Sequence, residues 1–282
     1  METKIYNLKV ITNLHVGSGD LSYGIIDKLV QRDVVSLFPT INASGIKGSI
    51  KEHLENYPDG SKTVVEYSEL LKKIFGSELQ PADNKFFSAH LLSYPVRSNI
   101  KPFFRATCPA ILNQLIESLR LFGIAKSKIK PIKSLLDESV KNFNTNSTSD
   151  FIIFQNLIDA IILEDYTEKF YDSEFVYNNT LVKLFGDKNE FVVVRDSVFM
   201  EICSDLPVVA RNNLDEKSRN LWYEEFVPRQ TEFWFFHLYK DFNAINELKR
   251  TKTLLQIGAN ASVGEGYCDI VELFNNNKTA RK

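Results

Sequence analysis

The sequence predicts an α+β fold, because segments with strand-like and helix-like patterns alternate along the chain. Polar and apolar residues alternate over residues 4–16, as in a strand with one buried face. Isoleucine and leucine recur at every fourth position from 46 to 54, as on one side of a helix. Residues 191–194 and 231–239 are rich in valine and aromatic side chains, which favours strands. The order strand, helix, strands, helix, strand is typical of a ferredoxin-like domain, here with large insertions.

The first strand ends at a glycine-containing break at residues 17–20. Its core-facing side carries the alternating residues of the pattern, namely Tyr6, Leu8, Val10, Thr12, Leu14 and Val16. Asn13 and His15 project from the other side of the same strand. A short strand is expected at 38–42, and Ser44 is expected as the N-cap of the helix that follows.

The later elements follow from the same rules. We expect strands at 89–96, 191–194, 231–239 and 267–273, helices at 111–122 and 243–253, and a polar loop at 142–150. Residues 151–164 are apolar, and their pattern does not distinguish a helix from a strand. The segment 204–220 lies between two predicted strands and is too polar for the core, so it is expected to project from the sheet.

Composition excludes several classes of protein. The chain has 282 residues, of which 44% are hydrophobic, which is enough for a sizeable core. It has no apolar run of membrane-spanning length, and its first residues lack a secretory apolar stretch. Cys108, Cys203 and Cys268 are far apart and odd in number, which indicates neither a disulfide framework nor a zinc site. A location in a reducing cytoplasm, with no membrane partner, is expected.

The near-neutral net charge of -2 hides two blocks of opposite sign. From position 97 to 133 basic residues outnumber acidic ones, with only Glu117 opposing Arg97, Lys101, Arg105, Arg120, Lys126, Lys128, Lys130 and Lys133. From 137 to 174 acidic residues predominate. These blocks are either two solvated faces, or a basic surface for phosphates beside an acidic surface for other subunits.

Two glycine-containing segments are candidate phosphate contacts. The helix start SGIKG (44–48) combines unpaired backbone N–H groups with Lys47, and its glycines allow a sugar-phosphate chain to approach. The second segment, 258–266, does not open a helix and lacks the spacing of a dinucleotide-binding fingerprint. Each segment also has a purely structural explanation, as a capped amphipathic helix and as a wide hairpin.

A third group consists of Asp20, Asp27 and Asp33, with His15 nearby in the sequence. Aspartates in a loop can hold a divalent metal ion or orient a nucleophile at phosphorus, or they can be solvated loop residues. Cleavage of RNA requires little from a protein, because the 2′-hydroxyl is an internal nucleophile. A single aspartate can therefore matter without a complete metal cage.

The order of these segments resembles the RAMP superfamily, and in particular the repeated backbone subunit of type III-B (Cmr) CRISPR complexes. The resemblance rests on HVGSG (15–19), ID (26–27), QRD (31–33), FP (38–39), SGIKG (44–48), HLLSYPVRS (90–98), LWYEEFVP (221–228) and QIGANASVGEG (256–266). These motifs span nearly the whole chain in the expected order. The resemblance implies an antiviral ribonucleoprotein subunit with an RRM-like palm and a projecting thumb.

The resemblance also implies partners, an activity and site residues. The partners are a CRISPR guide RNA, a complementary target RNA, further copies of the chain in a helical backbone, and other type III-B subunits. The activity is metal-dependent endoribonuclease cleavage of target RNA at regular intervals, with a divalent cation such as Mg²⁺ or Mn²⁺. The catalytic residues are Asp27, also the candidate metal ligand, and Glu225. The RNA-binding residues are His15, Ser44, Lys47, Gly48, Arg97, Arg211, Arg219, Gly258, Gly264 and Gly266.

We expect one RAMP domain over residues 1–282. Its palm is predicted from 1–60, 89–98, 191–203 and 229–274, its insertion at 99–190, and its thumb loop at 204–222. The polar thumb and Ala259, where a second glycine is frequent, depart from the family pattern. Three alternatives remain: a scaffold without cleavage, a RAMP endoribonuclease that processes precursor CRISPR RNA through a histidine such as His15, and an unrelated ferredoxin-like small-molecule enzyme.

Overall fold

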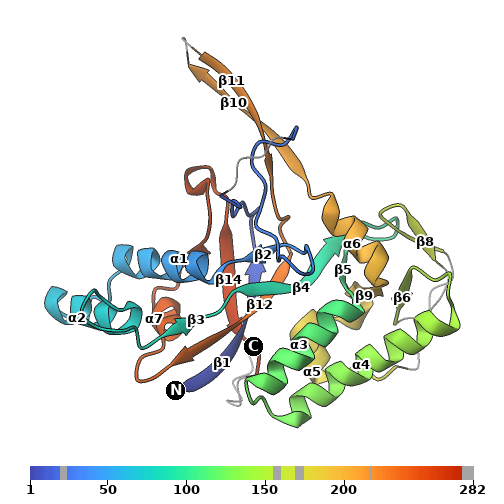
Figure 1. Cartoon of the computed structure of the whole chain (residues 1–282), viewed down its shortest axis with the longest axis horizontal. Coiled ribbons are helices and arrows are strands. Elements are labelled where there is room, and N and C mark those ends of the chain that lie inside the picture. Colours follow the sequence, from blue (N-terminus) through green and yellow to red (C-terminus); the bar gives the residue numbers. More distant parts are fainter. Residues whose placement is uncertain (20–23, 155–159, 169–174, 216–217, 275–282) are drawn as a thin grey trace. The chain divides into compact units, whose positions relative to one another are not determined.

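The computed structural model describes residues 1–19, 24–154, 160–168, 175–215 and 218–274 (Figure 1). The chain divides into two compact units. The first unit comprises residues 1–90 and 206–282, and the second comprises residues 91–205. Each unit has its own strands and helices. Within the described residues, no helix is long and apolar enough to cross a membrane.

The first unit contains an antiparallel sheet in the order β14-β1-β12-β3, with β13 at the edge beside β14. The strands are β1 (Glu2–Val10), β3 (Lys85–Phe86), β12 (Glu232–Tyr239), β13 (Leu255–Gln256) and β14 (Tyr267–Glu272). Helices α1 (Ala43–Asn56) and α7 (Ala244–Arg250) connect them in the order β1-α1-β3-β12-α7-β14. This is a ferredoxin-like arrangement, so the predicted α+β fold class is confirmed.

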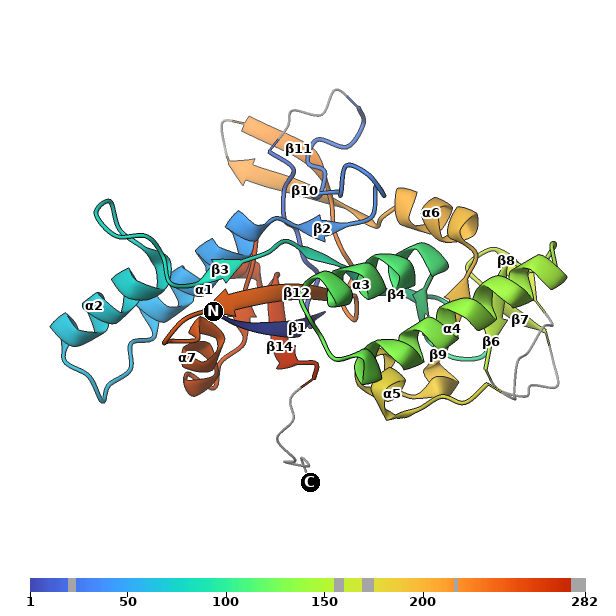
Figure 2. The ribbon, with the colours of Figure 1, turned by 60° about the horizontal axis from the view of Figure 1, so that its bottom comes forward.

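The core of this unit lies between the sheet and its helices. The alternating residues Tyr6, Leu8 and Val10 of β1 are fully buried, and the ring of Tyr6 stacks on Phe235 of β12. Helices α1 and α7 lie side by side (Figure 2). The stripe Ile46, Ile50 and Leu54 of α1 is buried, as its four-residue spacing predicts. A further helix, α2 (Val64–Phe75), begins with a capping box between Thr63 and Glu66.

A long hairpin projects from the first unit (Figure 1). It consists of β10 (Val208–Asp215) and β11 (Ser218–Glu225), which pair from Val208 opposite Glu225 to Asp215 opposite Ser218. We predicted a projecting loop at 204–222. The segment projects, and regular antiparallel pairing extends over most of it. The side chains of residues 213–220 lie outside the described part of the structure.

The second unit is built on strands in the order β4-β5-β9-β6, in which β5 and β9 are parallel. The strand β4 (Ala89–Val96), whose first two residues pair with β2 (Thr40–Ile41), leads the chain into this unit and confirms the strand predicted at 89–96. Its other strands are β5 (Phe104–Thr107), β6 (Phe151–Ile153), β7 (Ile161–Leu163), β8 (Tyr166–Glu168) and β9 (Phe191–Val194). Its α-helices are α3 (Pro109–Leu121), α4 (Lys126–Thr145), α5 (Asn179–Phe185) and α6 (Asp196–Ser204). Apolar side chains of α3 and α4 are buried, including Leu115 and Leu135.

Several local predictions need correction. The first strand ends at Val10 rather than at residue 16, because residues 11–16 bond to Tyr267 and Val227 outside the regular ladder. Helix α1 begins at Ala43, so Asn42 and not Ser44 occupies the N-cap position, without a side-chain cap. Residues 142–145, predicted as loop, complete α4. Residues 91–98 and 191–203, which we predicted as parts of the palm, lie in the second compact unit, and the predicted division into palm, insertion and thumb stays a prediction.

Candidate functional site

Asp27 lies in a loop that runs along the base of the hairpin. Its backbone N–H and that of Lys28 donate to the carbonyl of Tyr223, each over 3.1 Å. In return, the N–H of Tyr223 donates to Oδ2 of Asp27 over 2.8 Å. The side chain of Asp27 is exposed, and within the described residues its Oδ1 accepts no hydrogen bond. One oxygen of this carboxylate thus binds the hairpin, and the other is open to a ligand.

Glu225, the second predicted catalytic residue, is buried with a side chain only 3% exposed. Its Oε1 accepts from Nη2 of Arg32 over 2.6 Å, and its Oε2 accepts from the N–H of Val30 over 3.0 Å. Both oxygens therefore bind the loop that follows Asp27. Glu225 therefore positions the loop through both of its carboxylate oxygens.

His15 is also buried, and its Nδ1 lies 2.6 Å from the carbonyl oxygen of Glu225. A carbonyl oxygen only accepts hydrogen bonds, so Nδ1 carries the proton in this contact. A Cβ on Gly17 would come within 3.3 Å of the other ring nitrogen, Nε2. His15 therefore joins the first strand's continuation to β11 and does not present an open imidazole to solvent.

A network of charged groups joins three segments at the hairpin base. Glu224, only 1% exposed, accepts from Lys28 over 2.6 Å and from Nε of Arg211 over 2.5 Å. It also accepts from the indole N–H of Trp222 over 2.9 Å and from Asn260 over 3.0 Å. Burial raises the pKa of this carboxyl, but the four donors outweigh burial and lower the pKa to about 2. Glu224 is therefore ionised at neutral pH.

The predicted RNA-binding arginine Arg211 belongs to this network. Its Nη2 donates to Glu265 of the glycine-rich segment over 2.5 Å, while Nε binds Glu224. The second thumb arginine, Arg219, lies on β11 opposite Leu214, and its side chain lies outside the described part of the structure. Arg211 thus ties β10 to the rest of the first unit.

The glycine-rich segment packs against the strand that leads to Asp27. The N–H of Ala259 donates to the carbonyl of His15 over 2.9 Å, and that of Gly266 donates to Asn13 over 2.8 Å. Gly258 has φ +81°, and a Cβ there would lie 2.2 Å from the carbonyl oxygen of His15. Gly264 also has a positive φ but faces open space. Gly258 and Gly266 are therefore required for close backbone packing, while Gly264 is accessible.

The start of α1 lies in the same unit and is linked to the Asp27 loop. Ser44 and Gly48 are exposed, and Lys47 is half-buried without an ion pair to any described residue. Gln31 bridges the two elements, because its Oε1 accepts from the N–H of Asn42 over 2.8 Å while its amide donates to Gly17 over 3.1 Å. The open helix end and the exposed aspartate therefore belong to one connected framework.

The other predicted site residues lie elsewhere. Arg97 is in the second unit, where its guanidinium donates to Oε2 of Glu164 over 2.6 and 2.8 Å. Asp33 accepts from the N–H groups of Val35 and Ser36 and so stabilises its own turn. Partial burial raises the pKa of Asp33, but these hydrogen bonds outweigh it and lower the pKa. Asp20 lies outside the described residues.

Sequence reasoning missed the residues that hold the site together. Glu224, Lys28, Trp222, Asn260 and Glu265 were not predicted as site residues, although they neighbour motifs that were. Lys28 and Glu224 are 196 positions apart, and no periodic pattern links them. The available signal was the pair of adjacent glutamates in LWYEEFVP, of which only the second was selected.

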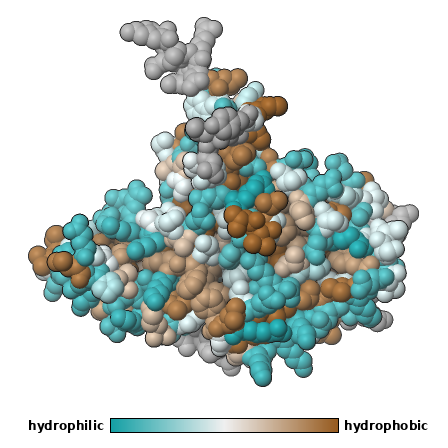
Figure 3. Space-filling view, viewed as in Figure 1, coloured by the Kyte–Doolittle hydropathy of each residue, from teal (hydrophilic) through white to brown (hydrophobic). Residues whose placement is uncertain are grey.

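Three apolar side chains between residues 25 and 35 are almost fully exposed. Ile25 is 86% exposed, and Val34 and Val35 are 91% and 89% exposed. Figure 3 shows hydrophobic surface below the projecting hairpin. Exposed apolar residues in such a group are typical of a surface that contacts another macromolecule.

Together, the fold and the site define a ferredoxin-like palm with a projecting hairpin and an exposed carboxylate at its base. The chain belongs to the RAMP superfamily, whose family model matches residues 7–269. It is 26% identical, over the full length of both chains, to the protein named CRISPR system Cmr endoribonuclease Cmr4 of Pyrococcus furiosus.

Solved structures share the fold. A chain of the type III-B Cmr-beta complex bound to cognate target RNA superposes with a TM-score of 0.71 at 22% identity, covering 97% of this chain and 98% of the other. A crystal structure of oligomeric Cmr4 from Pyrococcus furiosus gives a TM-score of 0.67 at 22% identity, covering 97% of this chain and all of the other. At this identity the likeness establishes the fold.

Proposed function

We propose that this chain is the repeated backbone subunit of a type III-B CRISPR ribonucleoprotein, and that it cleaves target RNA paired to the guide. The observation that carries the proposal is the carboxylate of Asp27, which is exposed yet fixed against the hairpin by the N–H of Tyr223. The full-length match to a protein named Cmr endoribonuclease supports the same activity. Cleavage and assembly would take place in the cytoplasm.

The open Oδ1 of Asp27 suits a general base toward an RNA 2′-hydroxyl. The carboxylate takes the 2′-proton, the 2′-oxygen attacks the adjacent phosphorus, and the bond to the 5′-oxygen breaks. The leaving 5′-oxygen takes a proton from water. The products are a 2′,3′-cyclic phosphate and a 5′-hydroxyl end. Attack requires the 2′-oxygen and the leaving oxygen in line, so the RNA backbone must be distorted at the cut.

A divalent cation fits this site in one way. Among the described residues, no three histidines, cysteines, aspartates or glutamates come together as a ligand set. Mg²⁺ is commonly bound through one or two carboxylates with phosphate oxygens supplied by the substrate, and Asp27 can provide such a carboxylate. When bound with the RNA, the cation would neutralise charge that develops at the phosphate.

The start of α1 is the proposed contact for the guide. Ser44 lies in the first turn of α1, where backbone N–H groups have no partner within the helix, and Lys47 and Gly48 follow in the next turn. Such helix ends attract phosphate. The hairpin is the proposed wedge between guide and target. The exposed apolar residues of the Asp27 loop suit contact with a neighbouring copy of the chain or with another subunit. Self-association is also supported by the related Cmr4 of Pyrococcus furiosus, whose crystal structure is that of an oligomer.

The burial of His15 counts against a processing enzyme with a histidine at its centre, because its ring is enclosed and its Nδ1 is bonded to Glu225. A scaffold without cleavage would not need the open carboxylate oxygen of Asp27. No cofactor fingerprint in the sequence supports a small-molecule enzyme.

The test is reconstitution of the complex with guide RNA and the other subunits. Wild type should cut a labelled complementary RNA at regular spacing and leave 2′,3′-cyclic phosphate ends. Asp27→Asn should assemble on the guide equally well and lose the cuts. Regular cutting by an assembled Asp27→Asn complex would overturn the assignment of Asp27, and absence of cutting by wild type would overturn the activity.

A further inference from the structure

Helix α4 of the second unit carries a row of lysines. Lys126, Lys130 and Lys133 are separated by four and three residues, so they lie on one face of the helix within its first turns. All three are exposed, and Lys128 adds a fourth cation in the same stretch. The first turn of α4 contains no acidic residue.

This arrangement opposes helix stability. Like charges three or four positions apart repel each other, and cations at a helix N-terminus face the positive end of the helix dipole. Within the described residues, none of these lysines makes an ion pair. The helix therefore carries unfavourable electrostatics that an anion on this face would relieve.

Two arginines of the basic block at 97–133 are neutralised inside the second unit. Arg97 pairs with Glu164, and Arg105 pairs with Glu190 over 3.2 Å. Arg97 and Arg105 thus hold the unit together, whereas Lys126, Lys130 and Lys133 on α4 face solvent, as does Arg120 on α3. The lysines on α4 are the members of the block that lie together on one exposed helix face.

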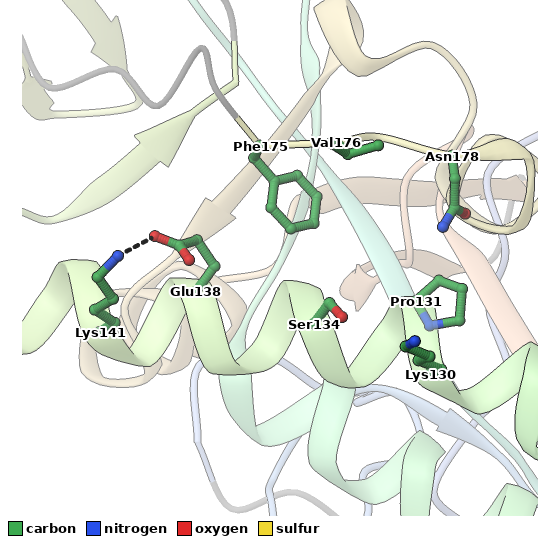
Figure 4. A pocket seen from close by; sticks show the side chains of 8 residues that line it. All are labelled: Lys130, Pro131, Ser134, Glu138, Lys141, Phe175, Val176 and Asn178. Atoms are coloured by element: carbon green, nitrogen blue, oxygen red, sulfur yellow. Dashed lines mark hydrogen bonds and ion pairs between the residues drawn. The ribbon is translucent and has the colours of Figure 1, made fainter.

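A cavity of about 500 Å³ adjoins the lysines (Figure 4). One wall is formed by α4 through Lys130, Pro131, Ser134 and the ion-paired Glu138 and Lys141, and the opposite wall is formed by Phe175, Val176 and Asn178. The Oδ1 of Asn178 accepts from the N–H groups of Thr180 and Leu181, so its amide nitrogen is turned away from α5. Figure 4 shows this nitrogen directed toward Pro131. The cavity therefore combines apolar side chains with hydrogen-bond donors, and the charge of its one lining carboxylate, Glu138, is balanced by Lys141.

We propose that the lysine face of α4 and this cavity form a surface for single-stranded RNA on the second unit. Phosphates lie along Lys126, Lys130 and Lys133, and a base enters the cavity between its apolar walls and the amide of Asn178. Proteins that hold single strands combine a basic track with aromatic or apolar base contacts, and this surface has both. An acidic protein would satisfy the lysines but would not require the cavity. The inference rests on the proposed function, because it presumes that the chain acts on RNA.

The test compares the full chain with three variants by fluorescence anisotropy of a labelled single-stranded RNA over a range of salt. The first variant is Lys126→Gln/Lys130→Gln/Lys133→Gln. The control, Lys72→Gln/Lys183→Gln/Lys240→Gln, removes the same charge from exposed lysines outside this face. Log affinity falls as log salt rises, and each phosphate contact on a single strand adds roughly 0.7 to the steepness of this fall. Loss of three contacts in the first variant should therefore make the fall less steep by about 2. The control should leave it unchanged.

The third variant, Ser134→Trp, fills the cavity and leaves the lysines in place. It should weaken binding of RNA but not of inorganic polyphosphate, whereas the triple lysine variant should weaken both. Equal salt slopes for the triple lysine variant and its control would overturn the inference. The inference would also fail if the triple lysine variant lost binding to an acidic peptide while it bound RNA like wild type. If either of these results is found while the wild-type complex cuts target RNA normally, the proposed function stands and only the assignment of this surface fails. If wild type binds no RNA, both fail.

Discussion

The N–H of Tyr223 donates a hydrogen bond to Oδ2 of Asp27 over 2.8 Å, and this contact connects a loop near the N-terminus to a strand near the C-terminus. The hairpin and the candidate catalytic carboxylate are therefore joined directly. A wedge that distorts RNA and a general base that takes the 2′-proton beside it need a fixed separation, because the 2′-oxygen must attack in line with the leaving oxygen. The hydrogen bond supplies that fixed relationship.

Asp27→Asn keeps an acceptor for the N–H of Tyr223 but removes the negative charge. We expect target cleavage to fall by about 10²–10⁴-fold, which is the usual contribution of a general base. Asp27→Ala should have the same effect on cleavage. Guide binding and assembly should be unchanged, as measured by native gel mobility. Asp33→Ala serves as the control, since Asp33 caps its own turn, and near-normal cutting is expected from it.

Glu224 makes the chain sensitive to acid. Its folded-state pKa of about 2 lies below the ordinary value of 4.5, so the ionised form is stabilised by folding. The resulting stability is fully present above about pH 4.5 and is lost as the pH falls toward 2. In Glu224→Gln the free energy of unfolding should therefore change less with pH between about 4.5 and 2 than it does in wild type. Urea unfolding followed by circular dichroism at several pH values measures this dependence. Identical pH dependence in both proteins would show that Glu224 is not held as described.

Gly258 and Gly264 offer a matched pair of substitutions, because both have φ +81°. Gly264→Ala meets open space, so it should cost about 1–2 kcal/mol for the left-handed backbone alone. Gly258→Ala adds a Cβ 2.2 Å from the carbonyl of His15, and such overpacking costs about 1–3 kcal/mol more. Denaturant unfolding of both variants measures the difference. A larger loss at Gly264 would contradict the packing of this loop on His15.

Local patterns predicted the elements whose residues are near in sequence. The valine-rich segment 191–194 forms β9, and the stripe at Ile46, Ile50 and Leu54 faces the core. The helix α2 was missed although Thr63 and Glu66 form a capping box. Helix α4 was not recognised as a whole, since Pro131 interrupts a helical pattern and asparagine-rich residues at its end favour a loop.

The site was predictable only in part, because its contacts join distant segments. Family motifs selected Asp27, and the structure holds it with an open oxygen at the hairpin base. The same motifs selected Arg211 as an RNA contact, but Arg211 binds Glu224 and Glu265. Polar residues in the thumb predicted exposure, yet the backbone pairing of β10 with β11 depends on register, which polarity does not reveal.

Lys47→Ala should weaken guide RNA binding about equally for all guide sequences, because a phosphate contact carries no base information. The loss should shrink as salt rises, with the slope of log affinity against log salt reduced by roughly 0.7. Lys51→Ala on the same helix is the control, since Lys51 already lies 3.7 Å from Glu55. Filter binding with guides of different sequence measures both variants. A loss that depends on guide sequence would point to a base contact instead.

The tip and the base of the hairpin can be separated experimentally. Arg211 and Trp222 are paired across the two strands, so a two-residue Asn-Gly turn can replace residues 212–221 between them. This shortened chain keeps the contacts of Arg211 and Trp222 with Glu224, and the bond from Tyr223 to Asp27. Its melting temperature should therefore stay near that of wild type.

If the projecting part of the hairpin separates guide from target, its removal leaves the catalytic carboxylate in place but the RNA undistorted. Regularly spaced cuts should then be lost even though Asp27 is intact, and guide binding through the start of α1 should persist. A target RNA with an unpaired nucleotide at each cut position supplies the distortion that the shortened hairpin cannot. Cleavage of that target should be partly restored, while Asp27→Asn should cut neither target. Regular cutting of a fully paired target by the shortened chain would show that the hairpin tip is not the wedge.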